Sequence, residues 1–431
     1  MDKKNYITFQ DGIKLNGPKA FNALTKPVGS VCNLACKYCY YIDKERFYGK
    51  HQPRMSDEML ENYIKEYIQT NEIPEITFCW HGGEPTLAGI DFFRKAVAFE
   101  RKYNTNNKKI INSIQTNGTL ITDEWANFFR KNRFLVGISI DGPEDIYNSY
   151  RVNKSGKGMY KSVMKGLEIL KRHHVDFNIL CVVTNKSAGR GKEIYNFFKE
   201  QGAQFLQFLP CVDYLKKDER YPDRAVIVDP IKINAGEAED PNSGIYPSPY
   251  NTTAEDYGQF LIDIFDEWVI NDVGKIFVQL FDLTLSSWCG IPPSVCAYRE
   301  TCGDVLAVEH NGDVFSCDHF VYPEHKLGNI QTSSISEMLR SQQQIDFGIN
   351  KRNTLSRECM RCEYYFACRG ECPKHRHIDT IDGEKKFSLC EGLKAFYKHV
   401  DPYMSFMRDM LSQEKAPALV MEWARAAKGM L

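Results

Sequence analysis

The chain has 431 residues, and its 55 Lys and Arg residues nearly balance its 56 Asp and Glu residues, giving a formal net charge of −1. The length predicts one large and one smaller domain, and the balanced charge argues against a nucleic-acid partner, which would favour a basic surface. No stretch approaches the roughly 18 consecutive apolar residues that span a bilayer, and the N-terminal residues lack the apolar core of a signal peptide. We therefore expect a cytoplasmic protein with no membrane partner, whose thiols stay reduced.

From residue 26 to about 215, short β-rich runs alternate with amphipathic helical runs. Strands are expected at 75–80, 110–115, 134–140, 176–184 and 203–210, with a further strand before Cys32. Helices are expected at 56–70, 91–103, 122–132, 157–174 and 191–202, several of them opening on a Ser, Thr or Asp cap. Six such β–α units predict an α/β fold, a partial (β/α)6 TIM-like barrel with a parallel sheet and covering helices.

The rest of the chain divides by composition into four further segments. Residues 1–25 are expected to be an N-terminal extension, and the barrel is expected to occupy 26–250. The last part of the barrel segment, 216–250, is rich in Pro, Asp and Gly, which predicts a long loop or lid. A linker region with a helix at about 253–271 is expected at 251–289 and a smaller cysteine-rich domain at 290–392. The tail, 393–431, is expected to be helical, with breaks near Pro402 and Pro417.

Eleven of the 15 cysteines form two groups with regular spacing. The first group is Cys32-x3-Cys36-x2-Cys39, and the second contains Cys296, Cys302, Cys317, Cys359, Cys362, Cys368, Cys372 and Cys390. Three thiolates can hold a metal cluster and leave one metal with an open position, which suits catalysis, whereas eight divide into two closed sets of four. Four-cysteine sites suit zinc as well as iron–sulfur clusters, so zinc stays open as an alternative for the second group. Disulfides are disfavoured in a reducing compartment.

Polar and glycine-rich signatures follow four of the expected strands. They are HGGEP (81–85), TNGT (116–119), SIDGP (139–143) and PCVD (210–213). The carboxyl ends of parallel strands share one rim of the fold, and glycines there let backbone amides approach a ligand closely. Each signature alone is more often an ordinary turn, but four of them on one rim, beside a three-cysteine loop, predict an active site.

The three-cysteine run, with Tyr38 before its last cysteine and HGGEP downstream, resembles the radical S-adenosylmethionine (SAM) enzymes. The eight later cysteines resemble the SPASM pattern, in which Cys302-x9-Gly312-x4-Cys317 precedes Cys359-x2-Cys362-x5-Cys368-x3-Cys372 and Cys390. With Asp318 directly after Cys317, the chain from about Lys26 to Cys390 resembles the anaerobic sulfatase-maturating enzymes.

The resemblance implies three 4Fe-4S clusters and SAM as cofactors. It implies that Cys32, Cys36 and Cys39 hold the cluster that binds SAM, with SAM contacts at Tyr38, Gly83, Ser139, Arg151 and Val212. It implies a first auxiliary cluster on Cys296, Cys302, Cys317 and Cys372, and a second on Cys359, Cys362, Cys368 and Cys390. Position 81 is His where related enzymes often have Gln, which is expected to alter contacts near SAM.

The resemblance also implies a reaction and its partners. A 5′-deoxyadenosyl radical would abstract a hydrogen atom from a Cys or Ser side chain of an unfolded sulfatase segment, and Asp318 would act as the general base in forming Cα-formylglycine. The auxiliary clusters would take the remaining electron, and a donor such as flavodoxin or ferredoxin would supply reducing electrons. Without the resemblance, Asp318 is equally well a solvated turn residue.

Other functional classes share part of the pattern. A SPASM maturase that forms thioether crosslinks in another ribosomal peptide shares most of the motifs, but the 31 residues before Cys32 are too few for the peptide-recognition domain that many of those enzymes carry. A zinc-stabilised interaction module would leave the three-cysteine loop and the glycine-rich rim unexplained. An RNA-modifying radical SAM enzyme would require a basic surface.

Overall fold

The computed structural model describes residues 8–14, 20–49, 54–217, 225–233, 237, 240, 242–427 and 429. The chain forms two compact units, each assembled from separate segments. Unit 1 comprises Met1–Ser139, Arg151–Phe177 and Glu300–Asn353, and unit 2 comprises Ile140–Tyr150, Asn178–Arg299 and Thr354–Leu431. The expected barrel segment and the expected cysteine-rich segment therefore each contribute residues to both units.

Unit 1 is built on a sheet whose strands lie in the order β4-β3-β2-β1-β11-β12-β13. The strands are β1 (Asn22–Lys26), β2 (Glu75–Trp80), β3 (Lys109–Thr116), β4 (Leu135–Ser139), β11 (Val305–Glu309), β12 (Asp313–Phe315) and β13 (Lys326–Asn329). Strands β1 to β4 pair in parallel, as expected, and β11 joins them in parallel beside β1. The carboxyl ends of β1, β2, β3, β4 and β11 therefore lie along one edge of this sheet.

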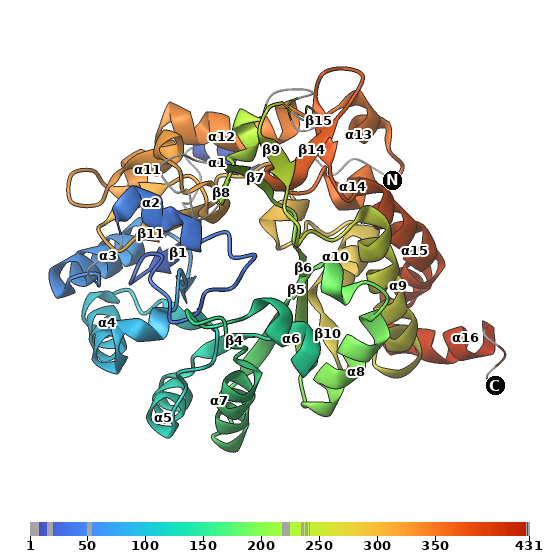
Figure 1. Ribbon diagram of the computed structural model, residues 1–431, viewed down its shortest axis with the longest axis horizontal. Coiled ribbons are helices and arrows are strands. Elements are labelled where there is room, and N and C mark those ends of the chain that lie inside the picture. Colours follow the sequence, from blue (N-terminus) through green and yellow to red (C-terminus); the bar gives the residue numbers. More distant parts are fainter. Residues whose placement is uncertain are drawn as a thin grey trace. The chain divides into compact units, whose positions relative to one another are not determined.

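Amphipathic helices connect and cover the parallel strands of unit 1, as Figure 1 shows. They are α3 (Asp57–Thr70), α4 (Ile90–Tyr103), α5 (Asp123–Asn132) and α7 (Tyr160–Arg172), with the shorter α1 (Phe9–Lys14), α2 (Glu45–Tyr48), α11 (Ile335–Arg340) and α12 (Gln342–Asn353). The side chains of Ser56 and Thr122 cap α3 and α5 by accepting backbone hydrogen bonds, as the sequence predicts. The buried Trp80 ring lies edge-on to Tyr63 and Phe93, which joins β2 to α3 and α4 in one aromatic core.

Unit 2 contains the parallel strands β10-β6-β5 and a larger share of helix. The strands are β5 (Phe177–Val183), β6 (Phe205–Pro210) and β10 (Phe277–Val278), with a hairpin of β14 (Arg376–Asp379) and β15 (Lys385–Phe387). The helices are α6 (Glu144–Tyr150), α8 (Gly191–Glu200), α9 (Ala254–Asn271), α10 (Gln279–Trp288), α13 (Arg357–Arg361), α14 (Tyr365–Cys368), α15 (Cys390–Ser412) and α16 (Val420–Ala427).

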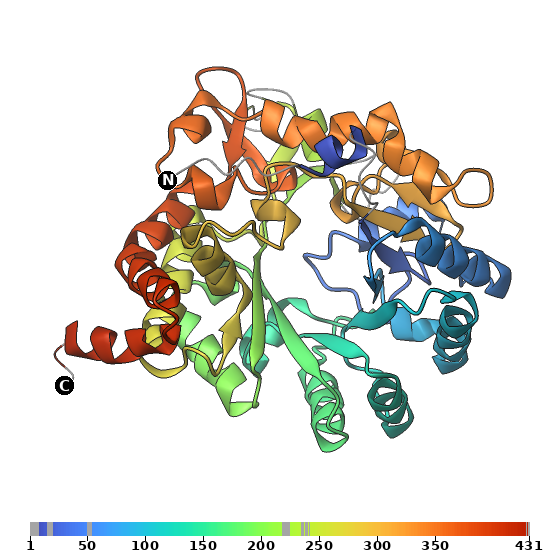
Figure 2. The same ribbon diagram turned by 180° about the vertical axis from the view of Figure 1, so that it is seen from behind.

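Helices α9 and α15 lie side by side in unit 2 (Figure 2). Two glycines face each other where they meet: a Cβ on Gly258 would lie 2.7 Å from the Cα of Gly392, and a Cβ on Gly392 would overlap the carbonyl of Ala254. The missing side chains let the two backbones approach closely, so the sequence needs glycine at both positions.

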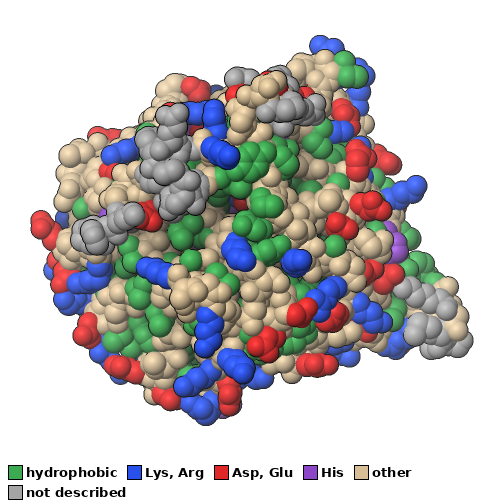
Figure 3. All heavy atoms as spheres, in the orientation of Figure 1, with side chains coloured by type: hydrophobic (Ala, Val, Ile, Leu, Met, Phe, Trp, Pro, Cys, Tyr) green, Lys and Arg blue, Asp and Glu red, His purple; other side chains and the backbone are tan. Residues whose placement is uncertain are grey.

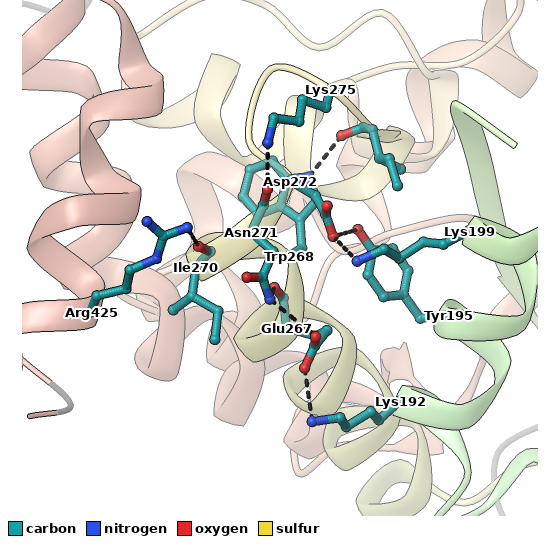
Figure 4. Close-up of polar contacts among 11 residues, drawn as sticks. Lys192, Tyr195, Lys199, Glu267, Trp268, Ile270, Asn271, Asp272, Lys275 and Arg425 are labelled. Carbon is teal, nitrogen blue, oxygen red and sulfur yellow. Dashed lines mark hydrogen bonds and ion pairs between the residues drawn. The ribbon is translucent and has the colours of Figure 1, made fainter. Parts of the chain in front are cut away.

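The end of α9 is fixed by polar contacts, drawn in Figure 4. The Asp272 carboxylate accepts hydrogen bonds from Lys199 Nζ at 2.6 Å and Tyr195 Oη at 2.9 Å, both on α8. The guanidinium of Arg425 on α16 donates to the carbonyl oxygen of Ile270 at 2.6 Å. Cationic donors at a helix C-terminus satisfy its last carbonyls and interact favourably with the helix dipole.

The segment 216–250 was expected to be a loop, and this prediction was wrong in part. Strands β7 (Tyr214–Lys217), β8 (Ala225–Ile227) and β9 (Ile245–Pro247) form a small antiparallel sheet in the order β8-β7-β9. Val226, Ile227 and Ile245 are buried, so the segment buries apolar side chains that the abundant Pro and Gly obscured. Residues 218–224, 234–236, 238, 239 and 241 of the expected loop lie outside the described residues.

The expected helix break near Pro402 is also wrong. Helix α15 runs from Cys390 to Ser412 with Pro402 inside it, and a new short helix starts only at Pro417. Proline removes one backbone hydrogen bond, but α15 packs along α9 and buries Val400, Met404 and Met407 on either side of the proline. Packing of this apolar face outweighs the lost hydrogen bond.

The surface mixes charges of both signs. On the face drawn in Figure 3, Lys and Arg side chains alternate with Asp and Glu side chains, and apolar side chains lie between them. Of the helices in the described part of the chain, none has the length and hydropathy that crossing a membrane requires.

Candidate active site and cluster sites

The three-cysteine loop follows β1 in unit 1 and is held by its backbone. The amide of Cys39 donates to the carbonyl of Cys36 at 3.1 Å, and the amide of Ala35 donates to the carbonyl of Val152 at 2.7 Å. All three cysteines of the loop are half-buried. The bond to Val152 places the loop directly beside Arg151, one of the expected SAM contacts.

Two nitrogen donors approach the sulfur of Cys32. The amide of Leu34 lies 3.3 Å from Cys32 Sγ, and Nδ2 of Asn117, which follows β3, lies 3.7 Å away. N–H groups aimed at a thiolate stabilise its negative charge and tune a bound cluster. Burial, with the nearby Glu84 carboxylate, raises the pKa of the Cys32 thiol far above its usual value. A bound metal cation would favour the ionised form of this thiol.

Gly83 allows the loop after β2 to lie against the three-cysteine loop. Its amide donates to the carbonyl of Gly29 at 2.8 Å, and the amide of Glu84 donates to the carbonyl of Val31 at 2.9 Å. A Cβ at position 83 would overlap the Val31 carbonyl, so only glycine fits. This close backbone approach is made to Gly29 and Val31, just before the three-cysteine loop, and the expected contact of Gly83 with SAM stays a prediction.

Glu84 ties the ends of β2 and β3 together. Its buried carboxylate accepts hydrogen bonds from the hydroxyl groups of Thr86 at 2.6 Å and Thr116 at 2.8 Å, and from the amide of Asn117 at 2.8 Å. Burial raises the pKa of Glu84, and these hydrogen bonds oppose that effect. The sequence showed HGGEP as a motif, but the role of its glutamate and of Asn117 depends on contacts between distant segments.

Four of the five expected SAM contacts lie in unit 1. The Arg151 guanidinium lies over the Tyr38 ring, 5.5 Å from its centroid, and Ser139, at the end of β4, accepts a hydrogen bond from Gln115 Nε2 at 3.0 Å. Arg151 and Ser139 are buried, as is Val212, which belongs to unit 2 and follows β6. A buried arginine held against an aromatic ring is the group expected to bind a carboxylate with two hydrogen bonds.

Asp318 lies in unit 1, in a short 3-10 helix (Asp318–Phe320) after β12. It forms an ion pair with Lys26, the last residue of β1, which is fully buried. The hydroxyl of Tyr40, the residue after Cys39, donates to Asp318 Oδ2 at 2.5 Å. Asp318 is itself buried, so it is not the solvated turn residue that its sequence context allowed. Its contacts place it directly beside the three-cysteine loop.

The charges around Asp318 keep it ionised. Burial acts to raise the pKa of its carboxyl, but Lys26, His81 and His319 together lower that pKa well below its usual range. Burial and the neighbouring Lys26 in turn lower the pKa of His81 to about 4. Because His81 is then neutral at neutral pH, Lys26 provides most of the stabilisation of the carboxylate. His81 Nδ1 lies 2.9 Å from Lys26 Nζ and accepts its hydrogen bond.

Sequence reasoning missed Lys26 and its neighbours. The ammonium of Lys26 lies 4.5 Å from the centroid of the Tyr41 ring, and the Tyr41 hydroxyl donates to Glu309. Glu309 is opposite Lys26 in the register of β11 with β1. The sequence did contain one signal, a lysine at the end of a buried strand, because buried lysines need a partner. The partner, Asp318, could not be identified from the sequence, because it depends on the pairing of β1 with β11, almost 300 residues away.

The four cysteines expected to hold the first auxiliary cluster come from both units. Cys302 precedes β11 and Cys317 follows β12 in unit 1, and the Cys302 amide donates to the carbonyl of Gly348 at 3.1 Å. Cys296 and Cys372 belong to unit 2, where each lies at the start of a short 3-10 turn. Their joint ligation stays a prediction.

The four cysteines expected to hold the second auxiliary cluster line one cavity in unit 2. Cys359 lies in α13 and Cys362 directly follows that helix. Cys368 is the last residue of α14, and Cys390 is the first residue of α15. Burial raises the pKa of Cys368 to about 12 and that of Cys390 to about 11. In the described part of the chain, no group of three or more His, Cys, Asp or Glu side chains is placed to hold a single metal ion, and these four thiols line one cavity. Their arrangement fits a cluster bound by four thiolates.

Two family models match this chain, one in its N-terminal half and one in its cysteine-rich segment. The family model of the Radical SAM superfamily matches residues 27–198, which include the three-cysteine loop. The model of the SPASM iron–sulfur cluster-binding domain matches residues 296–363, which include Cys296 to Cys362.

Individual relatives cover nearly the whole chain. The serine-type anaerobic sulfatase-maturating enzyme of Bacteroides thetaiotaomicron is 44% identical over 407 residues, which are 94% of this chain and 95% of the relative. The cysteine-type anaerobic sulfatase-maturating enzyme of Clostridium novyi is 35% identical over 387 residues, 88% of this chain and 95% of the relative. The solved structure of native anSMEcpe with bound AdoMet and Cp18Cys peptide matches with a TM-score of 0.76 at 32% identity, covering 90% of this chain and 99% of that one. On this likeness in sequence and in fold, the chain belongs to the anaerobic sulfatase-maturating enzymes, which are radical SAM enzymes with a SPASM domain.

Proposed function

We propose that this enzyme oxidises a Ser or Cys side chain in an unfolded sulfatase segment to Cα-formylglycine. Oxidation of Ser gives the aldehyde directly, whereas oxidation of Cys gives a thioaldehyde, which water hydrolyses to the aldehyde with release of sulfide. The observation that carries the proposal is the position of Asp318, buried, paired with Lys26 and hydrogen-bonded to Tyr40, the residue directly after Cys39. A proton acceptor beside the loop that would hold the radical-generating cluster is the arrangement that this oxidation requires. Family membership at 44% identity supports the same reaction.

Three 4Fe-4S clusters and SAM serve as cofactors, and we infer that the cysteines divide among the clusters in the sets that the sequence resemblance implies. Cys32, Cys36 and Cys39 would hold the SAM-binding cluster, and the two sets of four would hold the auxiliary clusters. When bound, these groups supply a 5′-deoxyadenosyl radical that takes one hydrogen atom from the substrate β-carbon, and an acceptor for the remaining electron. Tyr38, Gly83, Ser139, Arg151 and Val212 would bind SAM.

The chain's own residues would manage the proton. Asp318, ionised at neutral pH, would accept the proton of the substrate hydroxyl or thiol. Lys26 and Tyr40 fix the position of both carboxylate oxygens, and Lys26 balances the buried negative charge. The neutral His81 anchors the Lys26 ammonium, so it acts on the base through Lys26.

Serine is the substrate residue that we infer for this enzyme. The serine-type relative from Bacteroides is 44% identical, and the cysteine-type relative from Clostridium novyi is 35% identical. A thiol loses its proton more readily than a hydroxyl, so an enzyme equipped for Ser is expected to accept Cys as well. The sulfatase segment would be modified in the cytoplasm before it folds, with a low-potential carrier of the flavodoxin or ferredoxin class as the electron donor.

The test is anaerobic incubation of the reconstituted enzyme with SAM, a reductant and two sulfatase-derived peptides that differ only in Ser or Cys at the target position. Mass spectrometry distinguishes the two precursors, because each has its own mass change on conversion to the same aldehyde. Formylglycine from the Ser peptide is the expected result. Conversion of the Cys peptide alone would contradict the serine assignment, and a crosslinked product without aldehyde would contradict the proposed reaction.

A further inference from the structure

The cavity bordered by Cys359, Cys362, Cys368 and Cys390 is also lined by two charged side chains, those of Lys394 and Glu358. Lys394 follows Cys390 by one turn of α15, so the two residues share a face of that helix. Helices α13, α14 and α15, which carry these residues, are labelled next to one another in Figure 1. A permanent cation therefore lies at the edge of the space that the four thiols border.

Lys394 belongs to a cluster of four alternating charges. Its Nζ lies 3.7 Å from Glu358 Oε1 and 3.5 Å from Glu391 Oε1, and Lys386 Nζ lies 2.8 Å and 3.5 Å from the same two oxygens. The side chains of Lys386 and Lys394 are 15% and 33% exposed, whereas those of Glu358 and Glu391 are 46% and 67% exposed. The two cations thus lie deeper than the carboxylates, where water and salt screen their charge less.

Lys394 and Cys390 line the same cavity and lie one helical turn apart on α15. A 4Fe-4S cluster on four thiolates is an anion whose negative charge increases by one on reduction. A nearby cation therefore stabilises the reduced form more than the oxidised form and raises the reduction potential, and a nearby carboxylate lowers it.

We propose that Lys394 raises the reduction potential of the second auxiliary cluster, and that Glu358, which lines the same cavity, opposes it. The inference rests on the ligand assignment made under the proposed function. It goes beyond that function because it assigns to two residues outside the ligand set the control of how readily this cluster takes up one electron. The uptake is a one-electron step, in which the substrate-derived radical is oxidised and the cluster is reduced.

The test is a potentiometric titration of the reconstituted enzyme, followed by electron paramagnetic resonance, with the variants Lys394→Met and Glu358→Gln. Lys394→Met keeps most of the side-chain volume without the charge and is expected to make reduction about tenfold less favourable, which is about 59 mV for one electron. Glu358→Gln is expected to shift the potential in the opposite direction. Lys394→Arg keeps the charge and should leave the equilibrium constant for reduction within about twofold of wild type.

Glu391→Gln is the matched control, because Glu391 binds the same two lysines but is more exposed than Glu358 and does not line the cavity. Its shift should be smaller than that of Glu358→Gln. Iron content measured on every variant shows that the cluster is present. The proposal would be overturned if the equilibrium constant for reduction stays within twofold of wild type in both test variants. It would also be overturned if the potential moves in the same direction in both. Formylglycine formation is measured separately, so a wrong reaction assignment leaves these shifts intact and is recognised as such.

Discussion

Asp318 illustrates how the environment of one residue decides its chemistry. The carboxylate is buried between Lys26 and Tyr40, and both contacts stabilise its ionised form. Ionisation is what a proton acceptor needs, but a lowered pKa also reduces its affinity for a proton. The Lys26 partner therefore has two effects, since it holds the base in place and limits its strength.

Replacing Asp318 by Asn should uncouple the two halves of the reaction. The amide keeps the shape and can still accept a hydrogen bond from Tyr40, but it cannot take a proton. Hydrogen-atom abstraction needs no base, so formation of 5′-deoxyadenosine should continue, while aldehyde formation should fall by about 10²-fold or more. Both products are quantified in the same anaerobic reaction, with Asp346→Asn, an exposed carboxylate on α12, as the control. A near wild-type yield of formylglycine in the Asn variant would remove Asp318 from the mechanism.

Glu100 should make stability depend on pH. This residue of α4 is buried, accepts one hydrogen bond from Asn112 at 2.9 Å, and has its pKa raised to about 8 by burial. Because the folded-state pKa lies above the unfolded value, the stability that Glu100 contributes is complete below about pH 4.5 and is lost as pH rises towards 8. Glu100→Gln removes the titration and keeps an acceptor for Asn112.

The variant should therefore gain stability relative to wild type as the pH rises, by roughly 3 kcal/mol between about pH 5.5 and pH 8. Anaerobic urea unfolding at the two pH values measures this difference. An equal difference between variant and wild type at both pH values would show that Glu100 ionises normally in the folded protein.

At the scale of elements, the contact between α9 and α15 depends on Gly258 and Gly392. Gly392→Ala should destabilise unit 2 by about 3 kcal/mol or more, because its Cβ would overlap the Ala254 carbonyl and force the helices apart. Gly12→Ala on α1 is the matched control, since nothing lies within 4 Å of the Cβ it would add and alanine favours a helix. Thermal unfolding of both variants tests this, and equal midpoints would contradict the packing argument. Since α15 begins at Cys390, the Gly392 variant should also lose iron from the second auxiliary cluster.

For the whole molecule, the cluster assignment predicts a metal count. Three 4Fe-4S clusters should give about 12 irons per reconstituted chain and little zinc. Changing Cys32, Cys36 and Cys39 together to Ala should abolish SAM cleavage but leave about 8 irons, because the auxiliary clusters have their own ligands. Iron, zinc and 5′-deoxyadenosine are measured on the same preparations. Stoichiometric zinc with about 4 irons would refute the auxiliary clusters, and SAM cleavage by the triple variant would refute the assignment of the first.

The sequence by itself determined the local elements and the kinds of ligand. Hydrophobic periodicity predicted β2 at its observed bounds and β3, β4, β5 and β6 within two residues, because each of these strands has a strong apolar pattern of its own. The parallel strands β10 and β11 were not predicted. Cysteine spacing singled out the eleven candidate ligands, since metal chemistry restricts residue type and spacing. The sequence could not place Pro402 inside α15, because packing of that helix against α9 outweighs the tendency of proline to end a helix.

Only the tertiary structure decided which distant residues meet. Lys26 pairs with Asp318 because β11 lies beside β1, and Glu84 reaches Asn117 because β3 lies beside β2. The cavity in unit 2 joins Cys390 to Cys359 across an intervening hairpin. Such contacts depend on strand order and helix packing, which are set by the burial of whole apolar faces and not by any short stretch of sequence. The charge environment of the base and of the second cluster therefore exists only in the folded chain.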